Sequence, residues 1–168
     1  MLVFLTGFMG SGKSYTGRHL AKRLNYPFMD MDRYIEVQEG RSISEIFETD
    51  GEAAFREMER NVLHQLHPPL DMVVSTGGGL PCHGDNMAFM NEIGLTIFLD
   101  IDKEVLVDRL LNGRNRRPLL KGMNEYDLGF FYDEKMKERR PFYEQAAFQF
   151  RHQQLDILEE LVRSMEEE

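Results

Sequence analysis

The sequence predicts an α/β fold in which helices cover both faces of a parallel five-stranded sheet. Short runs of β-branched or aromatic residues are apolar at successive positions, as strands buried on both faces must be. Stretches with helical spacing of apolar residues separate these runs. Strands that alternate with helices in this way form parallel sheets.

Five segments are expected to form the strands, and helices are expected between them. The clear strands are residues 2–6, 72–76 and 95–100, and the shorter candidates are 28–29 and 148–150. The expected helices are 14–24, a segment from Phe55 to Leu66, 103–111 and 155–165. A further helix is expected to end near Arg139, where Pro141 should turn the chain. Its aromatic residues are expected to pack in the core, and they are Tyr126, Phe130, Phe131 and Tyr132.

Length and composition indicate one soluble domain spanning residues 1–168. The chain is 42% hydrophobic and 29% charged with a mean hydropathy of -0.45, and no apolar run approaches the ~20 residues of a spanning helix. A net charge of -9 argues against nucleic-acid and anionic-membrane partners. A single cysteine, Cys82, suits a reducing compartment, so we expect a cytoplasmic protein.

Residues 7–14, Gly-Phe-Met-Gly-Ser-Gly-Lys-Ser, match the phosphate-binding pattern G-x-x-x-x-G-K-[ST] between a strand and a helix. Glycines let successive backbone amides wrap a polyphosphate at the positive end of the helix. Lys13 would add a full charge, and the Ser14 hydroxyl could bind Mg²⁺. The predicted nucleotide-binding residues of this loop are Gly10, Ser11, Gly12, Lys13, Ser14 and Tyr15.

Two acids, Asp30 and Asp32, follow the second strand candidate. In an extended segment residues two apart point the same way, so both carboxylates could face one ligand crevice at the strand ends. One could act through the metal and the other could accept a hydrogen bond from a hydroxyl group. Acids in this position also serve as helix caps, which is the competing interpretation.

Further candidates lie near the ends of later elements. Arg56 could bind a carboxylate bidentately or form only a surface ion pair with Glu52 or Glu59. Three glycines at 77–79 follow a strand that ends in Ser-Thr, where nucleotide switches and motors usually carry an acid. The basic segment 112–123 is a candidate lid, and a solvated loop is the alternative.

In this order the motifs resemble those of the shikimate kinases, from residue 1 to about 143. The resemblance rests on the phosphate-binding loop, Asp30-Met31-Asp32, the Phe-Arg-Glu-Met-Glu segment at 55–59, the triple glycine, Arg117-Pro118-Leu119-Leu120, and Arg139 followed by Tyr143. It implies a three-layer P-loop kinase fold and ATP-dependent phosphorylation of the 3-hydroxyl of shikimate. The products would be ADP and shikimate 3-phosphate, on the route to chorismate and the aromatic amino acids.

The resemblance also implies roles for single residues. Asp32 would orient or deprotonate the attacking hydroxyl, while Lys13 and Arg117 would stabilise the transferred phosphoryl group. Arg56, Arg139 and the backbone of Gly78 and Gly79 would hold shikimate, and Ser14 and Asp30 would place Mg²⁺. The protein is expected to act as a monomer on shikimate and ATP.

The segment after the last strand departs from the family pattern. Arg151 is the nearest candidate for a contact to adenine, with Arg109 as an alternative. A kinase of another small hydroxy acid, such as gluconate, is the nearest rival function. A nucleotide-dependent switch that hydrolyses ATP or GTP slowly is the rival from another class.

Overall fold

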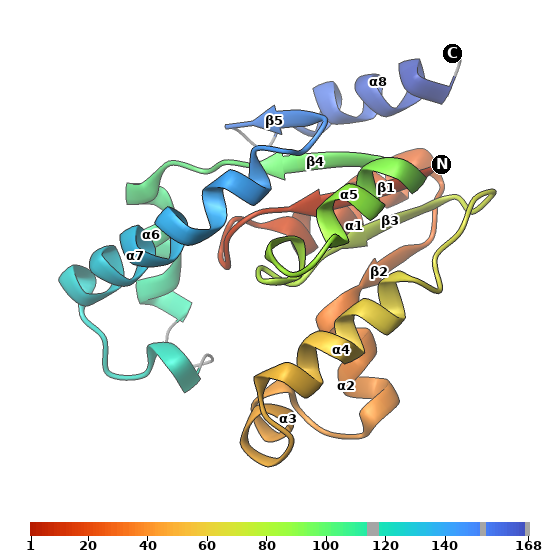
Figure 1. Cartoon of the computed structure of the whole chain (residues 1–168). Helices are drawn as coiled ribbons and strands as arrows, with labels where there is room; N and C mark the ends of the chain where they lie inside the picture. Colours follow the sequence, from red (N-terminus) through yellow and green to blue (C-terminus); the bar gives the residue numbers. More distant parts are fainter. Residues whose placement is uncertain (114–117, 152–153, 167–168) are drawn as a thin grey trace.

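A computed structural model describes residues 1–113, 118–151 and 154–166, and its centre is a five-stranded parallel sheet (Figure 1). The order across the sheet is β2-β3-β1-β4-β5, so β1 pairs with both β3 and β4. The strands are β1 (Leu2–Thr6), β2 (Phe28–Asp30), β3 (Met72–Ser75), β4 (Leu95–Leu99) and β5 (Phe148–Phe150). The predicted α/β fold is confirmed, with strand ends within one residue of the expected ones.

The described helices include three that the sequence pattern did not reveal. They are α1 (Lys13–Leu24), α2 (Met31–Glu39), α3 (Ile43–Thr49), α4 (Glu52–Leu63), α5 (Asn86–Ile93), α6 (Lys103–Gly113), α7 (Glu125–Tyr143) and α8 (Leu155–Glu166), with 3-10 turns at Leu80–Cys82 and Pro118–Leu120. The unexpected helices α2, α3 and α5 have 9, 7 and 8 residues. Helices this short show too few turns for a clear apolar period.

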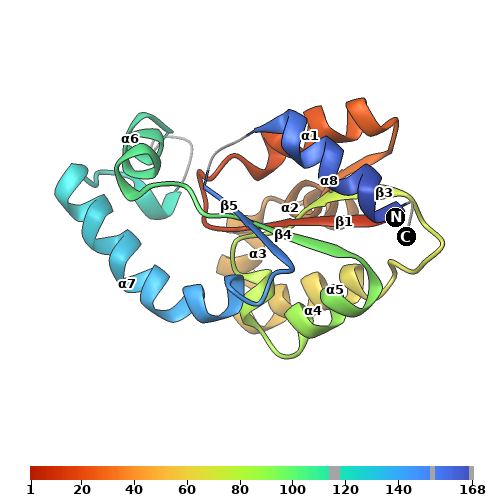
Figure 2. The same ribbon diagram turned by 90° about the horizontal axis from the view of Figure 1, so that it is seen from above.

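Alternate residues of β1 point into two different cores, which makes the fold three-layered (Figure 2). Val3 and Leu5 pack against α1 and α8, while Leu2 and Phe4 pack against α2, α4 and α5. All four side chains are at most 2% exposed, so β1 lies in the middle of the molecule. Its carboxyl end therefore leads directly from the core into the phosphate-binding loop.

A third core joins α6 and α7 to the carboxyl end of β4. Leu128, Tyr132 and Met136 form its stripe on α7, at a spacing of four residues. The prediction that the aromatic group packs inside is wrong for Tyr126 and Phe130, which are 82% and 62% exposed. They lie two residues from the buried stripe, which places them on the opposite side of the helix.

The expected turn at Pro141 is also corrected, because α7 continues through it to Tyr143. Proline lacks an N–H, so the helix loses one backbone bond at this point. The following turn still closes, since the amide of Glu144 donates to the Arg140 carbonyl at 2.9 Å. α7 therefore stays helical to its last residue, Tyr143. Among the described residues, no helix is both long and apolar enough to cross a bilayer.

Candidate active site

The loop between β1 and α1 forms a cradle of backbone amides. Gly10 and Gly12 adopt left-handed backbone conformations, with φ of 80° and 90°, which residues with a Cβ rarely adopt. Gly12 is the N-cap of α1, so the loop ends where the helix amides have no helical partner. The sequence-predicted loop therefore has the geometry of an anion site.

Lys13 holds its charge beside this cradle. Its Nζ donates to the carbonyls of Gly7 at 2.8 Å and Phe8 at 2.9 Å, and the residue is only 8% exposed. Both carbonyls belong to the loop itself. Tyr15, in the first turn of α1, is 55% exposed, and its ring centroid lies 4.2 Å from that of His19. The ammonium group thus adds a full positive charge to the amides of the loop.

Three oxygen-bearing side chains meet at the ends of neighbouring strands. Asp30 and Ser75 are paired residues of β2 and β3, which brings both beside the start of α1. The Ser14 hydroxyl donates to Asp30 Oδ2 and lies 3.3 Å from the Ser75 hydroxyl. Asp30 Oδ1 also accepts from the amide of Arg33 at 3.2 Å, as the N-cap of α2. Asp30 therefore both caps a helix and faces the phosphate-binding loop.

Asp32 is not in an extended segment, as the sequence analysis expected, but in the first turn of α2. The helix turns its carboxylate towards the glycine run after β3, where a Cβ on Gly77 would lie 2.7 Å from Asp32 Oδ1. Burial and the nearby Asp30 carboxylate raise the pKa of Asp32, against the charges of Lys13 and Arg56. A carboxylate with a raised pKa is a better proton acceptor.

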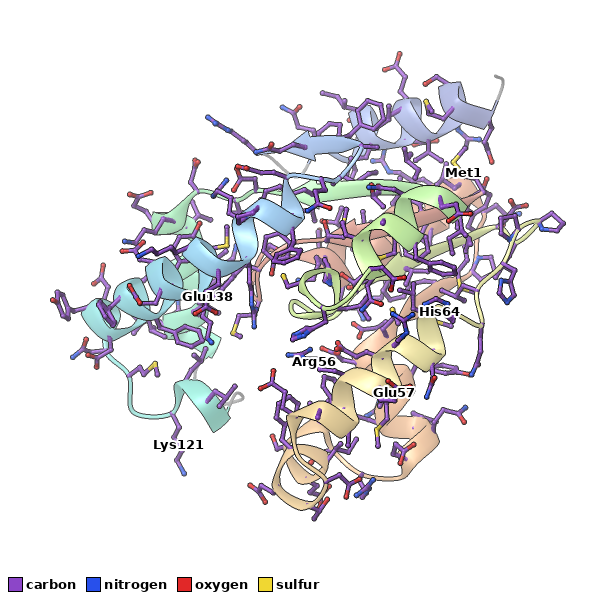
Figure 3. The ribbon with its side chains drawn as sticks, viewed as in Figure 1. Met1, Arg56, Glu57, His64, Lys121 and Glu138 are labelled. Carbon is purple, nitrogen blue, oxygen red and sulfur yellow. The ribbon has the colours of Figure 1, made fainter. Side chains whose placement is uncertain are left out.

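Arg56 projects from α4 over the same glycine run (Figure 3). A Cβ on Gly79 would lie 2.5 Å from both terminal nitrogens of the guanidinium, so a side chain there would displace the guanidinium. Nη1 donates to Glu59 at 2.6 Å and Nη2 donates to Glu52 at 3.1 Å. Both ion pairs that the sequence suggested are present, and they hold the arginine beside the glycines with 17% of its side chain exposed.

Arg139 reaches the glycine run from the opposite side, near the end of α7. Its Nη1 would lie 3.4 Å from a Cβ on Gly78, and its guanidinium is 5.7 Å from the ring centroid of Phe8. One turn later, the Tyr143 hydroxyl donates to the Gly78 carbonyl at 2.5 Å. The last turn of α7 is therefore fixed directly to the glycine run.

One cavity of about 320 Å³ is lined by Asp32, Arg56, Arg139 and the glycine run. Its polar lining combines the Asp32 carboxylate with the guanidinium groups of Arg56 and Arg139. The other lining residues are Met9, Ile43, Ser44, Phe47, Glu48, Phe55, Glu59, Gly77, Gly78, Gly79 and Leu119. A small, partly apolar molecule with a carboxylate and hydroxyl groups suits this combination of walls and charges.

Comparisons with known proteins give the family. The family model described as shikimate kinase matches residues 9–167. A shikimate kinase of Bacteroides fragilis is 46% identical over 146 residues, which are 87% of this chain and 82% of that protein. The chain belongs to the shikimate kinase family.

Solved shikimate kinases share the whole architecture. The crystal structure of the Bacteroides thetaiotaomicron enzyme matches with a TM-score of 0.90 and 40% identity, covering 100% of this chain and 99% of that one. The Acinetobacter baumannii enzyme in complex with shikimate matches with a TM-score of 0.83 and 34% identity, covering 98% of this chain and 92% of that one. The predicted P-loop kinase fold is thus confirmed.

Part of the predicted shikimate kinase lid lies outside the described residues. Arg117 is among them, so its place in the site stays a prediction. Just after the predicted lid arginine, Leu119 lines the cavity and is 74% exposed. The next residue, Leu120, is fully buried in the core between α6 and α7. Leu119 therefore brings the described part of this segment to the cavity.

The two candidates for adenine contacts occupy different places. Arg109 donates from Nη1 to the carbonyls of Gly10 at 3.3 Å and Ser11 at 3.4 Å. Arg151 follows β5 and is exposed. Arg109 is thus the candidate that contacts the phosphate-binding loop.

Glu59 is the site residue whose importance the sequence analysis missed. It is 1% exposed, lines the cavity, and would have its Oε1 2.6 Å from a Cβ on Gly77. Burial raises its pKa to about 7, although the adjacent Arg56 opposes this. Its spacing of three residues from Arg56 suggested only an ion pair, because a sequence does not show burial.

Proposed function

We propose that this chain transfers the γ-phosphoryl group of ATP to the 3-hydroxyl of shikimate, in the cavity beside the phosphate-binding loop. The products are shikimate 3-phosphate and ADP, on the route to chorismate and the aromatic amino acids. Membership of the shikimate kinase family supports this reaction. A relative of 34% identity in complex with shikimate supports the choice of acceptor.

One observation carries the assignment of the site. The Asp32 carboxylate shares a cavity with two guanidinium groups, and Met9 of the phosphate-binding loop is part of the same lining. An acceptor in this cavity therefore lies next to a triphosphate held by the loop. Phosphoryl transfer needs this proximity and little covalent chemistry from the protein.

The acceptor is held at both ends. Arg56 and Arg139 bind the carboxylate of shikimate, and the exposed backbone of Gly78 and Gly79 adds hydrogen bonds. Asp32 accepts the proton of the attacking hydroxyl and aims the oxygen at phosphorus, and its raised pKa favours that role. The orientation of the alcohol thus follows from contacts at the far side of the ring.

The nucleotide is held by the loop amides from Gly10 to Tyr15. Lys13 stabilises charge on the transferred phosphoryl group, and Arg117 joins it when the lid closes. Arg151, or Arg109 in its place, contacts the adenine. Closure excludes water, which would otherwise take the phosphoryl group.

The residues present fit a Mg²⁺ ion. Hydroxyl and carboxylate oxygens of Ser14, Asp30 and Ser75 converge beside the phosphate-binding loop, and such oxygens are the donors that Mg²⁺ prefers. Ser14 would hold the ion directly, and Asp30 would hold it through water. When bound, the ion neutralises charge on the phosphate oxygens.

The remaining proposals concern the state of the protein. We propose that the protein acts as a monomer. The single cysteine, Cys82, is partly buried, and burial raises its pKa to about 11, so the thiolate is scarce at neutral pH. A reduced thiol of this kind suits the cytoplasm, and the net charge of -9 disfavours nucleic-acid partners.

The test is a coupled ADP-release assay with Mg²⁺ over a panel of acceptors. We expect turnover with shikimate and almost none with gluconate, nucleoside monophosphates or water alone. Turnover of gluconate without turnover of shikimate would assign the cavity to another hydroxy acid. Equal ADP release with and without any acceptor would instead indicate a nucleotide switch.

A further inference from the structure

Arg140, the neighbour of Arg139 on α7, forms a two-pronged ion pair with the sheet. Its Nη1 donates to Asp100 Oδ2 and its Nη2 donates to Asp100 Oδ1, both at 3.0 Å. Paired bonds between a guanidinium and a carboxylate are stronger and more directional than a single contact. This pair therefore fixes the position of the helix turn that carries Arg140.

The carboxylate on the sheet side is itself held firmly. Asp100 directly follows β4, is 8% exposed, and its amide donates to the Phe150 carbonyl at 2.9 Å. Gln149 of β5 donates a further hydrogen bond to Oδ2 at 2.7 Å. Asp100 looks by position like the strand-end acid of a nucleotide site, but its oxygens are occupied by Arg140 and Gln149.

The pair acts beside a missing backbone bond of α7. Pro141 cannot donate a backbone bond, so the turn containing Arg139 and Arg140 has lost part of its helical support. Two polar contacts join this part of the helix to the sheet and the glycine run, the pair to Asp100 and the bond from Tyr143 to Gly78, beside the packing of the Tyr143 ring on Phe98. Consecutive residues on a helix point about 100° apart, so Arg139 faces the cavity while Arg140 faces the sheet.

We propose that Arg140 is a positioning residue for acceptor binding: its pair with Asp100 sets the place of the Arg139 guanidinium in the cavity. This inference rests on the proposed function of that cavity. Arg140 is absent from the cavity lining, so it acts only through the helix. Arginine binds a carboxylate well only when its fork is aligned, so a small displacement of α7 weakens binding of the acceptor.

The experiment compares steady-state kinetics of the wild type with Arg140→Gln, Arg140→Lys and Asp100→Asn. Lys135→Gln is the matched control, because Lys135 lies on the same helix and is similarly exposed (41% against 37%), and its ion pair in the described part of the chain is with Glu138 on the same helix. Melting temperatures and shikimate dissociation constants are measured for each variant. The lysine variant keeps the charge and guards against a glutamine variant that fails to fold.

We expect Arg140→Gln to raise the KM and the dissociation constant for shikimate about tenfold, with kcat and the KM for ATP within about twofold of wild type. The KM for shikimate of Arg140→Lys should fall between those of the wild type and Arg140→Gln, since an ammonium cannot form the bidentate pair of a guanidinium. The double variant Arg140→Gln/Asp100→Asn should be no worse than the poorer single variant, because both remove the same contact.

An unchanged KM for shikimate in Arg140→Gln, as in Lys135→Gln, would overturn the inference. So would an equal rise of both KM values with a lowered melting temperature, which is the result of general destabilisation. A wild-type protein that does not phosphorylate shikimate at all would overturn the proposed function instead. The two failures are therefore distinguishable.

Discussion

The nucleotide side and the acceptor side of the site are built in different ways. The phosphate-binding loop is one continuous stretch, Gly7 to Ser14, which runs from the end of β1 into the first turn of α1. The acceptor cavity collects Asp32 from α2, Arg56 from α4, the glycine run after β3 and Arg139 from α7. Local geometry is therefore sufficient for the first region, whereas the second depends on how four separate segments pack.

This difference decides how each region tolerates change. In the proposed nucleotide site, the backbone amides of the loop would do most of the binding, so few side chains would carry a large share. In the cavity, each side chain is aligned by neighbours from another element, as Arg56 is by Glu59 and Arg139 by the turn that Tyr143 fixes. Substitutions on the two sides should therefore separate ATP binding from shikimate binding.

The largest effect is expected for Asp32→Asn. A loss of ATP binding in this variant would contradict the separation of the nucleotide side from the acceptor side. An amide cannot accept the hydroxyl proton, so kcat should fall about a thousandfold while the dissociation constant for ATP changes little. ADP release and nucleotide titration measure the two quantities. Glu39→Gln, at the exposed end of the same helix, should behave as wild type. Near-full activity of Asp32→Asn would remove its proposed role.

Lys13→Ala tests the nucleotide side and should lower both the turnover rate and the affinity for ATP. Loss of its charge should lower kcat roughly a hundredfold and weaken ATP binding, with shikimate affinity in the free enzyme retained. Lys22→Ala, on the exposed face of the same helix, is the control. An unchanged ATP affinity would show that the ammonium does not reach the phosphates.

Arg56→Lys tests the acceptor side with the charge kept. A lysine cannot form the bidentate contact, so the KM for shikimate should rise about tenfold while the KM for ATP stays near the wild-type value. Steady-state kinetics in both substrates provide the measurement. Arg33→Lys, on an arginine with 75% of its side chain exposed, is the matched control. A matching rise in the KM for ATP would contradict the separation of the two regions.

The smallest effect concerns Glu59 and pH. Burial raises its pKa from 4.5 to about 7 in the folded protein, so the folded state holds a proton that the unfolded chain has released. The free energy of unfolding should therefore fall as pH rises from about 4.5 to about 7, by at most about 1.4 kcal/mol per pH unit, and then level off. Denaturant unfolding across this range measures it.

The control for the pH effect is the other acid on the same arginine. Glu59→Gln should reduce this slope, because it removes the titration of Glu59 and leaves only that of other groups such as Asp32, whose pKa is also raised. Glu52→Gln removes a carboxylate that is 61% exposed and should keep the slope. Identical slopes in all three proteins would mean that Glu59 titrates normally.

Much of the fold followed from local patterns. Leu2–Thr6 and Phe148–Phe150 were predicted with the observed bounds, since buried strands leave continuous apolar runs. The short helices α2 and α3 left no such signal, and for that reason Asp32 was expected in extended chain. Pro141 suggested a turn, yet α7 continues through Pro141 to Tyr143. The Tyr143 hydroxyl bonds to the glycine run, a contact between distant residues that the sequence does not show.

The amino-acid sequence by itself determined the phosphate-binding loop, because the glycines and Lys13 act through backbone geometry that neighbouring residues impose. It also determined which side chains could bind a carboxylate. Only the tertiary structure decided that Glu59 is buried against Arg56, and that of two adjacent arginines Arg139 faces the cavity while Arg140 pairs with Asp100. Burial and pairing depend on residues distant in the chain, so no local pattern encodes them.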